Sequence, residues 1–275
     1  METLKRFNQT TFIVLLFAFA LYSCQGEQKN KDAKDEAVTE TTNTEQTVTV
    51  ADKEYPIPTS FEVTQMINKA GASYIYDLCN SVENVDKYFT EKEKAINLGI
   101  YGADLSYAST YQKKQETMLY LEASKKLIDD LNVATAFNKE LAEKVEKNID
   151  NKDTLITLIS DSFYDTYEFL MDNGKDDLSV FVITGSWIEG LYITTQLTLN
   201  SQENDEMKEI IASQRESLNE LMKIMEQNKE NADMVDMMNK LGELKTEFDK
   251  IGETMTDEQL EVIITKVEKI RNELI

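Results

Sequence analysis

Histidine is absent from this sequence of 275 residues, and its absence excludes several kinds of chemistry. Histidine is the commonest general base, the usual activator of serine and cysteine nucleophiles, and the commonest metal ligand. A di-metal carboxylate bundle of the ferritin kind also needs it, in the motif Glu-x-x-His. We therefore expect a protein that is not an enzyme, with no catalytic residues, no metal ligands and no cofactor.

Residues that form turns and crosslinks are also scarce. The chain has 2 prolines and 9 glycines, too few for a fold of many short strands. Its 2 cysteines cannot make a disulfide framework. Basic residues number 29 against 51 acidic ones, so the formal net charge is −22 and would repel a phosphate backbone. The sequence therefore predicts a helical protein with no nucleic-acid partner.

The N-terminal residues 1–23 have the pattern of a secretory signal peptide. Lys5 and Arg6 form a short positive region, and an apolar run over residues 12–22 follows. That run is shorter than the roughly 20 residues that span a bilayer, but it matches the apolar region of a signal peptide. We expect these residues to be removed on export.

The signal ends in Leu21-Tyr22-Ser23-Cys24, which resembles the lipobox of bacterial lipoproteins. The resemblance implies cleavage before Cys24 and attachment of fatty acids, palmitate among them, at that residue. Three acyl chains exceed the two signals that stable anchoring needs, so a durable membrane anchor follows. Gln25 stands where an aspartate would retain a Gram-negative lipoprotein at the inner membrane. The resemblance therefore implies the outer membrane, and leaves open whether the protein faces the periplasm or the outside.

The composition of residues 24–58 predicts a disordered tether that follows the lipid. The stretch is rich in threonine, lysine and acidic residues, and no aromatic residue precedes Tyr55. Such a stretch buries too little apolar surface to offset the entropy lost on ordering. The two prolines of the chain close it in an extended conformation. The chain then divides into a signal peptide over 1–23, a lipidated tether over 24–58 and an all-α domain over 59–275.

The composition of residues 59–275 predicts the all-α fold. No proline follows residue 58, and residues that favour helices are abundant. Thr90 with Glu93 and Thr256 with Gln259 fit the capping box that begins a helix. We expect an irregular bundle of about eight helices. They would cover residues 62–79, 91–131, 135–149, 153–173, 177–198, 203–228, 231–251 and 256–274.

Residues 203–275 carry apolar side chains in steps of three and four. Steps that average 3.5 residues predict helices that pack nearly antiparallel in a bundle. We therefore expect a three-helix, heptad-like bundle here, with a four-helix arrangement as the alternative. The positions are Met207, Ile211, Gln214, Leu218, Leu221 and Met225, then Met237, Leu241, Leu244, Phe248 and Ile251, and finally Leu260, Ile263, Val267, Ile270 and Leu274.

Two of the expected helices differ from the others because they are apolar on every side. Residues 95–111 and 180–199 are mainly small, aliphatic or aromatic. A helix of this kind lies inside a fold. Glycine costs up to about 1 kcal/mol within a helix, so the glycines in both segments indicate close approach of two backbones. We expect these two helices to be the central pair.

Asp104 and Glu189 lie within these apolar segments and need compensation, because burial of an isolated charge is very costly. In a first arrangement, tyrosine, serine or lysine side chains satisfy each acid in a packed network. In a second, the two acids face each other across a pocket that suits a small polar or cationic ligand. In a third, paired carboxylates catalyse a reaction or hold a metal ion through oxygen ligands. The pocket would be lined by Asp104, Tyr107, Tyr111, Trp187, Glu189 and Tyr192.

With its lipobox, tether and helical body, the whole chain resembles uncharacterised helical lipoproteins of Gram-negative envelopes. The resemblance implies a non-enzymatic, membrane-anchored protein that binds an envelope protein or supports assembly at the outer membrane. The alternative is a lipoprotein that binds a small ligand between its two central helices. A cavity bounded by Asp104 and Glu189 would favour the alternative.

Overall fold

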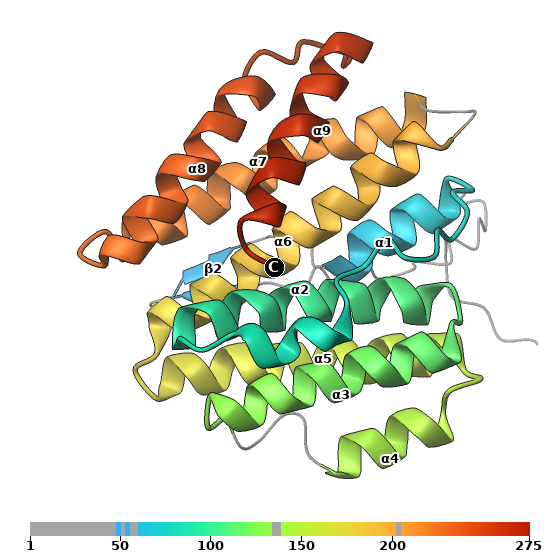
Figure 1. The fold of residues 1–275 in the computed structure, drawn as a ribbon. Coiled ribbons are helices and arrows are strands. Elements are labelled where there is room, and N and C mark those ends of the chain that lie inside the picture. Colours follow the sequence, from blue (N-terminus) through green and yellow to red (C-terminus); the bar gives the residue numbers. More distant parts are fainter. Residues whose placement is uncertain (1–47, 51–52, 56–59, 134–138, 202–204) are drawn as a thin grey trace, which may run out of the picture. The chain divides into compact units, whose positions relative to one another are not determined.

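The computed structural model describes residues 48–50, 53–55, 60–133, 139–201 and 205–275. The predicted signal peptide, Cys24 and most of the predicted tether lie outside these residues. The described residues form nine α-helices, one 3-10 helix and one small two-stranded sheet (Figure 1). The predicted all-α multi-helix bundle is thereby confirmed.

The elements in chain order are β1 (Val48–Val50), β2 (Lys53–Tyr55), α1 (Ser60–Lys69), the 3-10 helix η1 (Val82–Lys87), α2 (Glu91–Thr110), α3 (Lys114–Asp130), α4 (Lys139–Lys147), α5 (Lys152–Asp172), α6 (Asp176–Leu199), α7 (Asp205–Glu226), α8 (Ala232–Phe248) and α9 (Asp257–Asn272).

The two strands form an antiparallel hairpin inside the range for which we predicted disorder. Val48 lies opposite Tyr55, and Val50 lies opposite Lys53. Valine and threonine, which make up β1, are β-branched residues that favour strands. The strand β1 also lies beside α5, so the helical body supports the hairpin. The prediction of a tether without secondary structure up to residue 58 was therefore wrong for these residues.

Helices α2 and α6 form the centre of the domain, as the sequence predicted, and they contact each other along their length. Two glycines make this close approach possible. A Cβ atom on Gly99 would overlap the carbonyl oxygen of Val182, and one on Gly185 would overlap the carbonyl oxygen of Ile96. Any larger residue at either position would force the two helices apart.

The remaining helices cover this pair from opposite sides (Figure 1). Helices α3 and α5 pack against α2, and α4 packs against α5. Helices α7 and α9 pack against α6, and α8 contacts both of them. Helix α1 contacts α2, α6 and α7. The polar centres of α2 and α6 are therefore enclosed by other helices.

Both predicted capping boxes are present. The hydroxyl of Thr90 accepts a hydrogen bond from the backbone N–H of Glu93, whose carboxylate accepts one from the backbone N–H of Thr90. Thr256 and Gln259 make the same reciprocal pair at the start of α9. Local sequence therefore decides where α2 and α9 begin.

The helix predicted over residues 91–131 is instead two helices, α2 and α3, with a reversal at residues 111–113. Gln112 adopts a left-handed conformation with φ of 56°. The N–H groups of Gln112 and Lys113 close the end of α2 by binding the carbonyl oxygens of Ser109 and Ala108. The turn contains neither glycine nor proline, so the sequence pattern gave no sign of it. Packing of α3 back onto α2 imposes the reversal.

The helix predicted over residues 62–79 ends early, at Lys69. Gly71 follows in a left-handed conformation with φ of 81°. The next residues form a loop that side chains of α2 hold in place. The hydroxyl of Tyr107 accepts a hydrogen bond from the backbone N–H of Ile75, and the hydroxyl of Tyr111 donates one to the carbonyl oxygen of Ala72. Hydrogen bonds with these two tyrosine hydroxyls take the place of the helical hydrogen bonds expected for this segment.

The heptad pattern of residues 203–275 faces the core, but the bundle includes a fourth helix. Of the heptad positions, only Leu274 is not fully buried. Helix α8 contacts α7 and α9, and α6 contacts both of those helices as well. The four-helix alternative therefore describes this part of the domain, with α6 shared between the bundle and the central pair.

Among the described residues, α6 is the one helix long and apolar enough to cross a membrane. In its most apolar window, 89% of the residues are buried inside the domain. This degree of burial is what the core helix of a helical protein shows. The hydropathy of α6 is therefore explained by its central place in the fold.

Candidate functional site

Asp104 and Glu189 lie in the middle of α2 and α6 and are fully buried. Among the described residues, they are the only carboxylate side chains in the buried class. Their burial was predicted from the apolar surroundings of each in the sequence. What compensates them was left open, and the structure gives the answer.

Arg271, on the last turn of α9, compensates Glu189. Its guanidinium donates two hydrogen bonds to the carboxylate, Nε to Oε2 at 2.7 Å and Nη2 to Oε1 at 2.8 Å. The same Nη2 lies 3.4 Å from the carbonyl oxygen of Leu78, and the guanidinium carbon lies 4.1 Å from the centre of the Tyr192 ring. A bidentate guanidinium pair is the strong form of a charged hydrogen bond. Arg271 is itself buried, so this pair is shielded from water.

Sequence reasoning missed Arg271, because tyrosine, serine or lysine was expected to satisfy the acids. Two signals in the sequence point to it. The chain contains only three arginines, Arg6, Arg215 and Arg271. Arg271 also follows Ile270, a heptad position, so it lies at the edge of the buried stripe of α9. Arginine suits a buried ion pair better than lysine does, because its planar group binds a carboxylate through two donors.

Asp104 is compensated only in part. Its Oδ2 accepts a hydrogen bond of 3.1 Å from the backbone N–H of Asn80, while its Oδ1 has no hydrogen-bond partner among the described residues. Burial raises the pKa of Asp104 well above its usual range, and the negative charge of Glu189 raises it further, whereas Arg271 lowers it. With a proton on Asp104, the group of two carboxyls and one guanidinium is electrically neutral.

The thiol of Cys79 lies next to this group, in the loop between α1 and η1. Burial raises the pKa of Cys79, and the negative charges of Asp104 and Glu189 raise it further. A hydrogen bond with Tyr120 acts in the opposite direction. Only the thiolate is a good nucleophile, so a raised pKa makes this cysteine unreactive. These contacts indicate a structural role for Cys79.

Of the six residues predicted to line one ligand pocket, Tyr107, Tyr111 and Tyr192 pack in one apolar cluster, whereas Trp187 belongs to another. Tyr107 and Tyr111 pack around the ring of Tyr74, with ring centres 4.6 Å and 5.6 Å from it. Tyr192 stacks on Arg271, which occupies the space beside Glu189. Trp187 borders a void with no room for a water molecule, closed by side chains of α8 and α9.

The predicted pocket between the central helices is therefore filled, as far as the described residues show. Asp104 and Glu189 lie close enough for the charge of Glu189 to raise the pKa of Asp104, and the guanidinium of Arg271 occupies the space beside Glu189. The physical reason is the close approach of α2 and α6 at their glycines, which leaves no volume for a ligand. The packed network considered for these acids comes nearest to what is observed, but an arginine and a backbone N–H group bind them in place of tyrosine, serine or lysine side chains, and Oδ1 of Asp104 has no partner among the described residues.

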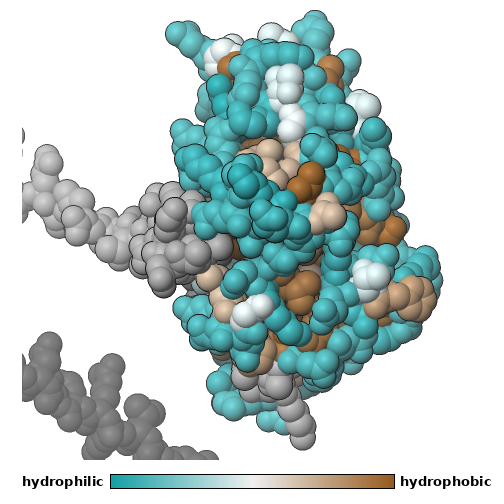
Figure 2. Space-filling model, turned by 90° about the vertical axis from the view of Figure 1, so that its left-hand side faces the viewer, coloured by the Kyte–Doolittle hydropathy of each residue, from teal (hydrophilic) through white to brown (hydrophobic). Residues whose placement is uncertain are grey.

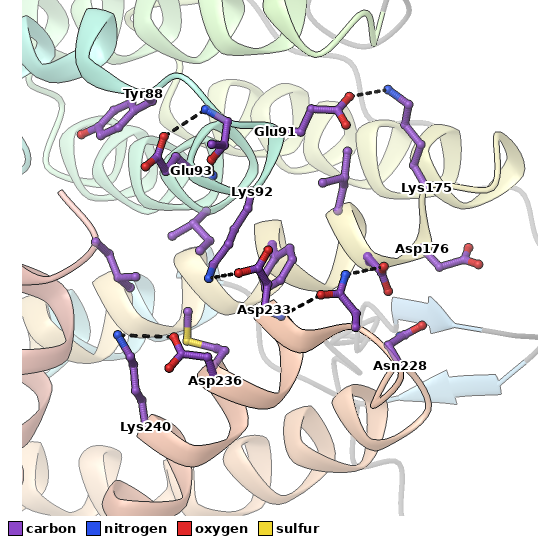
Figure 3. A pocket seen from close by; sticks show the side chains of 18 of the residues that line it. Tyr88, Glu91, Lys92, Glu93, Lys175, Asp176, Asn228, Asp233, Asp236 and Lys240 are labelled. Carbon is purple, nitrogen blue, oxygen red and sulfur yellow. Dashed lines mark hydrogen bonds and ion pairs between the residues drawn. The ribbon is translucent and has the colours of Figure 1, made fainter.

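A surface groove of about 1110 Å³ lies elsewhere, where the N-terminal ends of α2, α6 and α8 meet (Figure 3). Its deepest side chains are apolar and almost fully buried, Ile96, Phe181 and Met237. Charged side chains form its walls. Eight carboxylates and four lysines line it, so its net formal charge is negative. Sequence reasoning did not find the groove, because the three helix ends are far apart in the chain.

Ion pairs between different elements fasten the walls of this groove (Figure 3). Each of three lysines reaches from one element to a carboxylate on another. The side-chain amide of Asn231 adds a hydrogen bond of 2.6 Å to Asp177. The three ion pairs are Lys92–Asp233 at 2.8 Å, Lys175–Glu91 at 3.4 Å and Lys240–Glu273 at 2.7 Å.

Within the described part of the chain, no group of three or more cysteine, aspartate and glutamate side chains is arranged to hold a metal ion. Comparisons of the chain with protein-family models, with curated proteins and with solved structures find no match. The chemistry of its own residues is therefore the basis for a functional proposal.

Proposed function

We propose that this chain is a lipid-anchored, non-enzymatic protein of the bacterial cell envelope whose helical domain binds a partner protein or supports assembly at the outer membrane. The binding role is supported by a difference between the interior of the domain, which is closed, and its surface, which has an open groove. The buried acids are closed off by Arg271, whereas the groove at the ends of α2, α6 and α8 is open and lined by charged residues. Recognition therefore takes place on the surface of the domain.

The envelope location is supported by the N-terminal sequence. Leu21-Tyr22-Ser23-Cys24 follows an apolar run and a positive N-terminus, as in lipoproteins, and Gln25 is the outer-membrane type of following residue. Acyl chains on Cys24 would hold the domain at the membrane without a spanning helix. Residues 25–47 would then separate the lipid from the hairpin.

The non-enzymatic role is supported by the side chains available for chemistry. Histidine is absent, and burial keeps the Cys79 thiol protonated. The acids in the interior are used in packing, because one binds Arg271 and the other binds a backbone N–H group. Most helix surfaces carry charged residues, and hydrophilic residues dominate the face drawn in Figure 2. A charged surface of this kind serves solubility and recognition.

Membrane fractionation tests the anchor. The wild-type chain should sediment with the outer membrane, and Cys24→Ser should abolish this association because the lipobox then has no cysteine to receive the lipid. Detergent-extractable labelling with a radioactive fatty acid should be lost in the same variant. Cys79→Ser is the matched control and should retain both properties. A Cys24→Ser protein that stays in the membrane fraction would disprove the anchor.

Crosslinking tests the binding role. Lysine-directed crosslinking in intact cells, followed by purification of the wild-type protein, should recover a defined envelope protein in repeated preparations. Its yield should fall when Cys24→Ser releases the domain from the membrane, because the anchor keeps the two proteins at high local concentration. Recovery of the lipoprotein alone in every preparation would contradict the proposal.

A further inference from the structure

We infer that the groove between the N-terminal ends of α2, α6 and α8 binds a segment of the partner polypeptide that is rich in lysine or arginine. The inference rests on the proposed function, because it names the surface and the chemistry through which the partner would be bound. It is carried by the charges of the groove, by the way its lysines are paired and by an exposed aromatic residue beside it.

Three of the four lysines of the groove are already engaged in ion pairs, and the fourth, Lys87, binds the side-chain oxygen of Asn84. Lys92, Lys175 and Lys240 each link two different elements through a carboxylate. An anionic ligand would have to draw these lysines away and would break the links that hold the groove walls together. This pairing disfavours phosphate groups and acidic peptides as ligands of the groove.

The carboxylates of the groove are in excess. The eight carboxylates outnumber the four lysines, and none of the ion pairs among the described residues includes Asp176, Asp177 or Glu230. Three helix N-termini meet here, and each contributes about half a positive charge. Together they offset less than half of the excess of four negative charges. A cationic segment would complete the charge balance of the groove.

An exposed aromatic side chain favours a polypeptide over a small polyamine. Phe89 is 81% exposed, and its neighbours Tyr88 and Thr90 both line the groove. A polyamine would satisfy the carboxylates and leave this ring uncovered. A basic peptide carries aliphatic and aromatic side chains that can cover it, and buried aromatic residues often dominate the affinity of an interface. An open groove with a charged wall and one apolar residue at its side suits such a segment.

Binding of a defined probe tests the charge requirement. The probe is a fluorescein-labelled peptide of alternating lysine and alanine, followed by fluorescence anisotropy with the full chain carrying Cys24→Ser. The variant Asp176→Asn, Asp177→Asn, Glu230→Gln should weaken binding by about tenfold, because it removes three carboxylates that make no ion pair among the described residues. The control Glu206→Gln, Glu209→Gln, Glu216→Gln removes the same charge from exposed positions of α7 and should change binding by less than about twofold. Equal loss in both variants would overturn the inference, and thermal melting verifies that both are folded.

Photocrosslinking in cells separates this inference from the proposed function. A photoreactive aromatic amino acid replaces Phe89 in the wild-type chain, and the position of each crosslink in the partner is mapped. The expected result is a partner segment with an excess of lysine and arginine. A segment without that excess, or no crosslink at Phe89 while lysine-directed crosslinking still recovers a partner, overturns the inference and leaves the proposed function intact. Failure of both crosslinking methods overturns the proposed function as well.

Discussion

Arg271 near the end of α9 binds Glu189 in the middle of α6 through two hydrogen bonds of 2.7 Å and 2.8 Å, across 82 positions of sequence. The pair joins the last helix to the central pair, beside the second buried acid, Asp104. Two carboxyl groups and one guanidinium thus lie together in the buried interior of the domain. The stability of the domain and its dependence on pH both follow from this arrangement.

Asp104 should make the domain less stable as pH rises. Its pKa is raised in the folded state, so the folded state binds more protons than the unfolded state above the usual value of 3.8. The stabilisation from this proton is fully present below that value and is lost as pH rises through the folded pKa. Asp104→Asn keeps the shape of the side chain and removes the dependence. The stability of the variant relative to the wild type should therefore increase as pH rises, because only the wild type loses this contribution.

Urea denaturation at pH 5 and pH 8 measures this effect. The difference in unfolding free energy between Asp104→Asn and the wild type should grow from the lower to the higher pH. Asp161→Asn, at an exposed position of α5, is the control and should show no such growth. A constant difference at the two pH values would show that Asp104 is already ionised in the folded state.

Removal of Arg271 should be strongly destabilising. Arg271→Met leaves Glu189 buried with no counter-charge and should cost about 3–5 kcal/mol, the range for a broken buried ion pair. The double variant Glu189→Gln, Arg271→Met should cost clearly less than the sum of the single variants, because no unpaired charge remains. Lys240→Met, which breaks the exposed pair with Glu273, should cost less than about 1 kcal/mol. Chemical denaturation of the wild type, Glu189→Gln, Arg271→Met and the double variant gives the coupling energy. Additive losses would contradict a specific Arg271–Glu189 interaction.

The glycines of the central pair should not tolerate alanine. A methyl group on Gly99 would overlap the backbone of α6, so Gly99→Ala should cost at least about 1–3 kcal/mol, the usual cost of overpacking. Gly242 lies within α8 with no atom near the position of a Cβ. Gly242→Ala should therefore stabilise the protein by about 0.5–1 kcal/mol through helix propensity. Thermal melting compares the two variants. A higher melting temperature for Gly99→Ala, as expected for Gly242→Ala, would show that α2 and α6 are not in close contact.

The Cys79 thiol should react slowly in the folded protein. In the Cys24→Ser chain it is the only thiol, so a thiol reagent reports on it alone. Because its pKa is raised, its rate at pH 8 should be at least about tenfold lower than in the urea-unfolded chain. Asp104→Asn removes one of the causes of the raised pKa and should speed the reaction in the folded state. Equal rates in folded and unfolded protein would contradict the buried environment described for this thiol.

The helical content and the central pair could be predicted because they depend on local composition and on periodicity. Segments 95–111 and 180–199 are apolar on every side, and such helices have no stable place except the core. The capping boxes at Thr90 and Thr256 were equally readable, because each is a contact between residues three positions apart. The helix ends at Lys69 and Thr110 could not be predicted in this way, because packing and tyrosine hydrogen bonds decide them.

The same division between local and long-range information applies to the buried acids and their surroundings. The sequence identified Asp104 and Glu189 as buried acids, since each lies in an apolar segment. It did not identify Arg271 as the counter-charge, because the partner comes from another helix and no local pattern links the two. The predicted ligand pocket was based on residues that share a helix face. Which of these residues meet in space depends on how the helices pack, and no local pattern shows this.

The sequence by itself determined the all-α class, the order of most helices, the burial of two acids and the absence of histidine chemistry, because these follow from residue type and from spacing within a few turns. Only the tertiary structure decided that Arg271 closes the interior and that the N-terminal ends of α2, α6 and α8 form a charged groove. Both arrangements bring together side chains that are far apart in the chain. Their positions depend on how the helices pack, which the period of an individual helix does not specify.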